Sequence, residues 1–226
     1  MSKLIVIDGI DGSGKATQAK LLVERLKRRR HSSRLAGSPS DKDKNINVEY
    51  FNFPQYENNF FGKMIRQYLA GDFGKPTEIH PRLASILYAA DRWESKTKLE
   101  QWLAAGKTVV VDRYYTSNLI HQGAKLPPEQ LDEFINWINE LEFNIFKIPK
   151  PDIVIYLHVP ATVANQLITA RGQGHDGHEN VAHLKTAEQR CLYLAKKLGW
   201  TKIECCDNLK LLPVEEISEK IWQALN

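Results

Sequence analysis

The stretch KLIVIDGIDGSGKATQAKLL, residues 3–22, decides the fold. It begins with an apolar run that ends at Asp8, continues through a glycine-rich turn and ends in a helical pattern. Within it, Gly9–Lys15 fits the first part of the phosphate-binding pattern G-x-x-x-x-G-K-[S/T]. A strand, a glycine turn and a helix in this order predict a loop whose backbone N–H groups and helix N-terminus hold phosphate oxygens. We expect Lys15 to reach the β- and γ-phosphates of a bound nucleotide.

The residue after the lysine departs from this pattern. Ala16 stands where a Ser or Thr hydroxyl is expected to contact magnesium. Thr17 lies one residue further on, so its side chain points elsewhere and is not expected to replace that hydroxyl. Magnesium retains water and phosphate ligands readily, and two carboxylates, Asp8 and Asp112, end apolar runs. We therefore predict a magnesium ion that these two carboxylates hold through water.

Continuous apolar runs elsewhere in the chain predict the rest of the sheet. Strands are expected at 3–8, 48–53, 107–112 and 152–159, with a weaker one at 201–206. Runs without alternation indicate strands buried on both faces, as in a parallel sheet. Helical patterns separate them at 15–30, 58–70, 80–105, 129–143, 161–171, 179–198 and 214–225. This alternation predicts an α/β fold, a doubly wound parallel sheet of about five strands flanked by helices, in a single domain over residues 1–226.

Composition narrows the classes of protein to which the chain can belong. With 42% hydrophobic and 26% charged residues it is typical of a globular protein. No apolar stretch approaches a membrane span or a signal-peptide core, so we expect a cytoplasmic protein with no membrane partner. The three cysteines have neither a disulfide framework nor metal-ligand spacing. The net charge of +4 is mild, and we expect no nucleic-acid partner, because small phosphate ligands explain it equally well.

One segment, residues 28–45, differs from the rest in being polar, charged and rich in serine. We expect it to be a flexible surface insertion between the first helix and the second strand. A basic contact site for a partner is the alternative interpretation.

Four further segments carry a family resemblance. They are NFPQYENNFFGKMIRQYL (52–69), ILYAADRWE (86–94), VVVDRYYTSNLIHQGAK (109–125) and PKPDIVIYL (149–157). With the phosphate-binding loop, they resemble the thymidylate kinase family of P-loop nucleoside monophosphate kinases, from residue 3 to about residue 200. The resemblance implies transfer of the γ-phosphoryl group of ATP to dTMP, giving dTDP and ADP, with Mg²⁺ as cofactor. It also implies a homodimer formed through helices beside the Asp-Arg-Tyr segment.

The same resemblance implies roles for individual residues. Arg113 is expected to grip the acceptor phosphate, and Asp11 to bind the sugar 3′-hydroxyl. Tyr88 is expected to stack on the thymine ring, and Arg92, one helical turn later, to read a base carbonyl. The remaining acceptor contacts are expected from Phe53, Ser117 and Gln122. The ATP contacts are expected from Gly9, Asp11, Gly12, Ser13, Gly14, Lys15, Ala16 and Thr17.

The glycine-rich segment TARGQGHDGHENVAHLK, residues 169–185, resembles the family's lid, which closes over ATP. Residues 172–184 contain no Lys or Arg, so Arg171 is the expected lid residue that stabilises the transferred phosphoryl group. His175 and His178 are possible helpers, or else simply solvated. Lys15, Arg113 and Arg171 are therefore the predicted catalytic residues.

Two departures from the family pattern keep other functions open. Tyr56 stands where many members have an arginine near the acceptor phosphate, and Arg66 is a candidate to compensate. A kinase for another deoxynucleotide or nucleoside is therefore one alternative. A catalytically inert nucleotide-binding regulator is another, although the retention of Lys15 and Arg113 argues against it.

Overall fold

The computed structural model describes residues 2–35, 47–170 and 181–225. Its centre is a five-stranded sheet in the order β2-β3-β1-β4-β5, with every neighbouring pair parallel. The strands are β1 (Leu4–Asp8), β2 (Val48–Asn52), β3 (Thr108–Asp112), β4 (Ile153–His158) and β5 (Thr201–Glu204). In the register of the two central strands, Ile7 lies opposite Asp112. The predicted α/β fold with a parallel sheet of about five strands is confirmed, and Asp8 and Asp112 lie at the same edge of the sheet.

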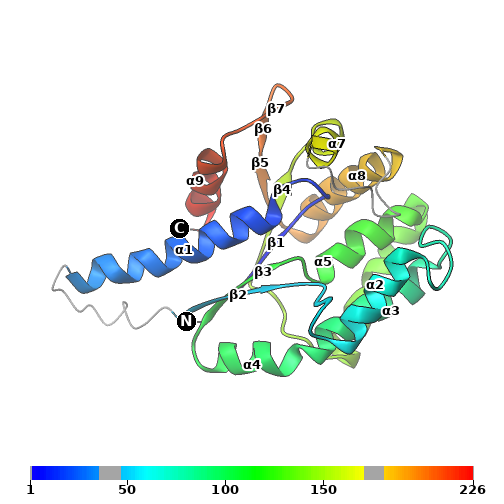
Figure 1. Cartoon of the computed structure of the whole chain (residues 1–226), viewed down its shortest axis with the longest axis horizontal. Helices are drawn as coiled ribbons and strands as arrows, with labels where there is room; N and C mark the ends of the chain where they lie inside the picture. The colour runs from blue at the N-terminus through cyan, green and yellow to red at the C-terminus, as the bar shows by residue number, and fades with distance from the viewer. Residues whose placement is uncertain (1, 36–46, 171–180, 226) are drawn as a thin grey trace.

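Helices cover both faces of the sheet (Figure 1). On one face, α1 (Lys15–Leu35) crosses the strands beside α9 (Val214–Ala224). The helices on the opposite face include α4 (Lys96–Ala104), α5 (Tyr115–Ser117) and α8 (Val181–Leu198). The other helices are α2 (Phe60–Ala70), α3 (Pro81–Glu94), α6 (Leu131–Asn139) and α7 (Ala161–Ala170). Irregular helical turns η1 (Asn118–Gln122), η2 (Gly123–Lys125), η3 (Pro128–Gln130) and η4 (Glu140–Ile145) complete the connections.

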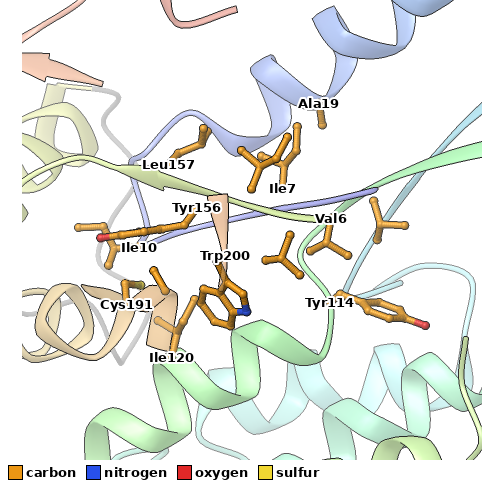
Figure 2. Packing of buried hydrophobic residues seen from close by; sticks show 14 of the residues in the cluster. Val6, Ile7, Ile10, Ala19, Tyr114, Ile120, Tyr156, Leu157, Cys191 and Trp200 are labelled. Carbon is orange, nitrogen blue, oxygen red and sulfur yellow. The ribbon is translucent and has the colours of Figure 1, made fainter. Parts of the chain in front are cut away.

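The core forms because the strands carry apolar side chains on both faces. β1 and β3 are buried throughout their lengths. In Figure 2, Ile7 and Leu157 point towards α1, whereas Tyr156 and Trp200 lie on the other side of the sheet, near Ile120. The hydrophobic effect on both faces thus fixes the register of the strands, and with it the positions of the residues that follow them.

The helices differ from the sequence prediction at three places. The first helix continues to Leu35, so residues 28–35 are helical rather than part of the expected insertion, of which 36–45 lies outside the described residues. The pattern at 80–105 is two helices, which are divided at Ser95, where the Asn59 amide donates to the Ser95 hydroxyl (2.8 Å). The pattern at 129–143 ends as an α-helix at Asn139 and continues as a π-helical turn.

A two-stranded antiparallel ribbon, β6 (Cys206–Asp207) with β7 (Lys210–Leu211), was not predicted. Its turn residues Asn208 and Leu209 have positive φ angles, and only the asparagine is a residue that favours this conformation. Across the described ranges, no helix combines the length and the apolar character that a membrane span requires.

Candidate functional site

The loop after β1 has a backbone that only glycine fits at two positions. A Cβ atom on Gly9 would lie 2.7 Å from the backbone oxygen of Leu157, and one on Gly12 would lie 2.8 Å from that of Ala164. Gly12 also has φ +82, in the left-handed region. The glycines therefore permit a tight turn that packs against β4 and α7.

The turn leads directly into the N-terminus of α1. The first helical hydrogen bond is donated by Gln18 N–H to Gly14 O (3.0 Å), so the N–H groups of Lys15, Ala16 and Thr17 have no partner within the helix. The Lys15 ammonium donates to Gly9 O (3.0 Å) and Ile10 O (2.7 Å), and its side chain is only 6% exposed. Burial and the nearby Arg113 lower the pKa of Lys15. A cation and several N–H donors that have no partner within the helix thus lie together, as anion binding requires.

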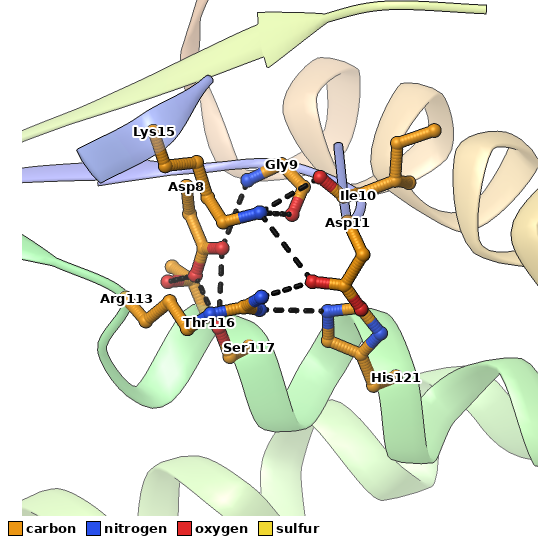
Figure 3. Close-up of polar contacts among 9 residues, drawn as sticks. All are labelled: Asp8, Gly9, Ile10, Asp11, Lys15, Arg113, Thr116, Ser117 and His121. Carbon is orange, nitrogen blue, oxygen red and sulfur yellow. Dashed lines mark hydrogen bonds and ion pairs between the residues drawn. The ribbon is translucent and has the colours of Figure 1, made fainter. Parts of the chain in front are cut away.

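Two carboxylates lie at the carboxyl ends of neighbouring strands, but their surroundings differ. Both oxygens of Asp8 accept hydrogen bonds, from Gly9 N–H (2.8 Å) and from the Thr116 and Ser117 hydroxyls (Figure 3). The Oδ1 atom of Asp112 is buried and has no hydrogen-bond partner among the described residues. Burial raises the pKa of Asp112, and Lys15 and Arg113 offset part of this effect. A buried oxygen without a donor suits a cation or its water ligand, so Asp112 fits a metal site better than Asp8 does.

Arg113 follows Asp112 and crosses to the glycine loop. Its φ of 64° is in the left-handed region, where an arginine is uncommon. Its guanidinium forms an ion pair with Asp11 through Nη2 and contacts His121 Nε2 through Nη1 at 3.2 Å (Figure 3). Burial opposes charge on both members of the pair. Their mutual attraction nevertheless holds the pKa of Asp11 well below its usual range and that of Arg113 above it.

A pocket with about 690 Å³ of atom-free space, part of it open to solvent, lies beside the glycine loop. All the residues that the sequence assigned to the acceptor line it: Asp11, Phe53, Tyr88, Arg92, Arg113, Ser117 and Gln122. Tyr56, Asn118 and His121 line it as well, and none of these three was predicted as a binding residue.

Arg92 is buried, and it forms an ion pair with a buried carboxylate. Arg92 is 2% exposed, and its partner Glu142, on η4, is 0% exposed. The Arg92 Nε atom lies 3.1 and 3.2 Å from the two carboxylate oxygens, and Nη2 also donates to Glu142. The amide of Asn118 donates to Glu142 (3.3 Å) and to Ser85 O (3.1 Å). One buried carboxylate therefore orients two side chains that line the pocket.

The wall of the pocket at the end of β2 is fixed by Asp91. Asp91 accepts from Gln55 N–H (3.1 Å) and from the Asn59 amide (2.8 Å), which anchors the turn after the cis Phe53–Pro54 peptide bond. Tyr56, in this turn, lines the pocket. Arg66, on α2, is exposed, pairs with Glu57 and does not line the pocket.

The predicted lid is only partly described. Helices α7 and α8 flank it as expected, but Arg171, His175 and His178 lie outside the described residues. No group of three or more His, Cys, Asp or Glu residues suited to a metal ion occurs in the portion of the chain that the structure describes.

A glycine loop of the phosphate-binding pattern beside a pocket, at the carboxyl edge of a parallel sheet, defines the class of P-loop nucleotide-binding proteins. The thymidylate kinase family model matches residues 7–221, and the chain belongs to the thymidylate kinase family.

Individual relatives agree with this membership. The chain is 30% identical to the thymidylate kinase of Plasmodium falciparum (isolate 3D7) over 203 residues, which cover 89% of this chain and 81% of the relative. It is 28% identical to the Homo sapiens thymidylate kinase over 213 residues, covering 92% and 84%. A solved thymidylate kinase structure from Candida albicans superposes with a TM-score of 0.72 at 22% identity, covering 99% of this chain and 91% of that one, and so supports the fold.

Proposed function

We propose that this chain transfers the γ-phosphoryl group of ATP to dTMP and produces ADP and dTDP. Membership of the thymidylate kinase family supports this activity. The observation that carries it to particular residues is that every predicted acceptor residue lines one pocket, which adjoins the glycine loop. Asp11 belongs to both the loop and the pocket, so the donor and acceptor sites meet there.

In this proposal the protein contributes positioning and positive charge. The unpaired N–H groups at the start of α1 bind the donor phosphates, and Lys15 leaves the loop carbonyls to contact the transferred group. Arg113 holds the acceptor phosphate with its planar fork of donors. The acceptor needs no strong general base, because a phosphate monoester is already a dianion near neutral pH.

The base and sugar contacts follow from the lining of the pocket. Tyr88 stacks on the thymine ring, and Phe53 lines the same pocket. Arg92, held by Glu142, donates to a base carbonyl, while Ser117 and Gln122 lie near the pyrimidine. Asp11 accepts from the sugar 3′-hydroxyl. Arg171 is proposed to stabilise the transferred phosphoryl group from the lid.

Magnesium is proposed to bind between the phosphates and Asp112. The buried Oδ1 atom of Asp112 supports this role, because it has no hydrogen-bond partner in the part of the chain that the structure describes. The ion would neutralise charge on the phosphate oxygens. Asp8, whose oxygens already accept hydrogen bonds, would act mainly by orienting Ser117 and Thr116. Ala16 offers no hydroxyl to the ion, so water takes that place.

A homodimer is the proposed assembly, and the outer face of α3 is its proposed interface. Leu83 and Ile86, which are adjacent on that helix, are both exposed apolar side chains. Sedimentation velocity should give a dimer for the wild type and a monomer for Leu83→Glu. Leu209→Glu, at an exposed leucine on the β6–β7 turn, is the matched control and should remain dimeric. A monomeric wild type contradicts this interface.

The activity is tested by ADP formation from ATP with dTMP, dUMP, dCMP, dGMP or thymidine as acceptor, with and without Mg²⁺. We expect metal-dependent turnover that is selective for dTMP. Selective turnover of another acceptor would show that the chain is a kinase with a different acceptor specificity, for which Tyr56 and the pocket that it lines would be the first residues to test. Failure with every acceptor, despite ATP binding, would contradict the proposal.

A further inference from the structure

His121 lies where the acceptor pocket meets the glycine loop. It belongs to η1 and lines the pocket, although no role follows for it from the family pattern. Its Nε2 atom is 3.2 Å from Nη1 of Arg113, while Nη2 of the same guanidinium pairs with Asp11. Figure 3 shows the guanidinium facing both the Asp11 carboxylate and the His121 ring, with one contact drawn to each.

The chemistry of this contact determines the protonation of the ring. A guanidinium has donors and no acceptor, so His121 Nε2 must accept the hydrogen bond, and the ring proton is then on Nδ1. Burial lowers the pKa of His121 to about 3, and the positive charge of Arg113 acts in the same direction while Asp11 opposes it. His121 is therefore a neutral acceptor at physiological pH.

Two anchors on different nitrogen atoms restrain the arginine more than one does. With Asp11 alone, the guanidinium plane can rotate about the Nη2 contact. The second contact, at Nη1, fixes the plane and leaves three of the five N–H groups for a ligand. The nearly parallel ring of His183, on α8, lies with its centroid 6.0 Å from that of the His121 ring.

This restraint matters because the acceptor pocket has few cations. Its lining contains two arginines in the described part of the chain, and Glu142 already holds Arg92. Tyr56 lines the pocket without a charge, and Arg66 pairs with Glu57 outside it. An acceptor phosphate therefore depends on Arg113, and a preoriented guanidinium loses less freedom when the phosphate binds.

We propose that His121 is a positioning residue that orients Arg113 to receive the acceptor phosphate. This role rests on the proposed function, in which Arg113 grips that phosphate. His121 acts through its Nε2 atom, which accepts from Arg113. The role therefore requires a hydrogen-bond acceptor at that place, and another side chain with an acceptor there can fill it.

The test compares His121→Phe, which keeps a flat ring but has no acceptor, with His121→Gln, whose amide oxygen can occupy a place near Nε2. Loss of a hydrogen bond to a charged group reduces affinity by about tenfold to a hundredfold. We expect His121→Phe to raise the KM for dTMP by that factor and to leave the KM for ATP unchanged. His121→Gln should restore the KM for dTMP to within about threefold of the wild type.

Two further measurements separate this role from a general structural one. Binding of thymidine, which has no phosphate, should be equal in the wild type and His121→Phe by calorimetry. In an Arg113→Met background, His121→Phe should cause no further loss of dTMP affinity. Equal losses for thymidine and dTMP, or an additive double variant, would overturn the proposal. A wild-type enzyme that phosphorylates no dTMP would overturn the proposed function itself, whereas normal dTMP kinetics in His121→Phe would overturn only the role of His121.

Discussion

The ion pair between Arg92 and Glu142 allows a quantitative prediction about stability. Glu142→Ala removes a carboxylate that accepts from Arg92 and Asn118 and that is 0% exposed. The substitution leaves a buried guanidinium without its ion-pair partner and with the Tyr114 backbone oxygen (3.4 Å from Nη1) as a remaining acceptor. Breaking a buried pair in this way costs about 3–5 kcal/mol. Since about 1 kcal/mol shifts Tm by about 2–4 °C in a protein of this size, Tm should fall by about 6–20 °C.

The double variant Arg92→Met/Glu142→Leu tests the physical reason for this loss. It removes both charges and fills the space with apolar side chains, so it should recover most of the stability that Glu142→Ala loses. Urea unfolding, followed by circular dichroism, measures the free energy of unfolding for each variant, and equal m-values would show that the same surface is exposed. An uncompensated buried charge is not the cause of the loss if Glu142→Ala lowers the free energy of unfolding by less than about 1 kcal/mol, or if the double variant is as unstable as the single one.

Three further changes test other parts of the structure. Gly12→Ala should lower the free energy of unfolding by about 2 kcal/mol or more, because its Cβ would meet the Ala164 oxygen. Gly14→Ala has the same φ of +82 but no atom within 4 Å of the added Cβ, so it should lower the free energy of unfolding by only about 1 kcal/mol in the same experiment. Ala16→Ser should lower the Mg²⁺ concentration for half-maximal turnover in a metal titration; an unchanged midpoint would argue against a metal ion beside this position. Burial lowers the pKa of Lys125 to about 8, so the unfolded chain binds more protons between pH 8 and 10 and stability should rise with pH there. Lys125→Met should flatten that rise, and an equal slope would contradict the shift.

The sheet was predictable because its strands carry a simple signal. The five strands begin and end within two residues of their predicted bounds, since continuous apolar runs occur where a strand is buried on both faces. The division of the pattern at 80–105 was not predictable, because it depends on the hydrogen bond that Ser95 accepts from Asn59, 36 positions earlier in the chain. The extension of α1 to Leu35 crosses a polar segment without apolar periodicity, so the sequence offered no signal for it.

The candidate site also contains residues that the sequence predicted and residues that it did not. The acceptor residues assigned by resemblance line one pocket beside the glycine loop, because the motif fixes each of them relative to a strand or helix. Glu142 was missed, since its segment was interpreted only as part of the helical pattern at 129–143 and nothing marked one carboxylate as buried. His121 was missed because its role depends on the side chain of Arg113, whose position is a property of the folded chain.

The most direct test of the account follows the labelled phosphate itself. Wild-type protein, [γ-³²P]ATP, dTMP and Mg²⁺ are incubated together, and the nucleotides are separated from inorganic phosphate. If the site positions the two substrates and excludes water, the wild type should put the label in dTDP and little of it in inorganic phosphate. Lys15→Met should put no label in dTDP. Label in inorganic phosphate alone, or equal label in dTDP for Lys15→Met, would contradict the claim that this loop and this pocket form one phosphoryl-transfer site.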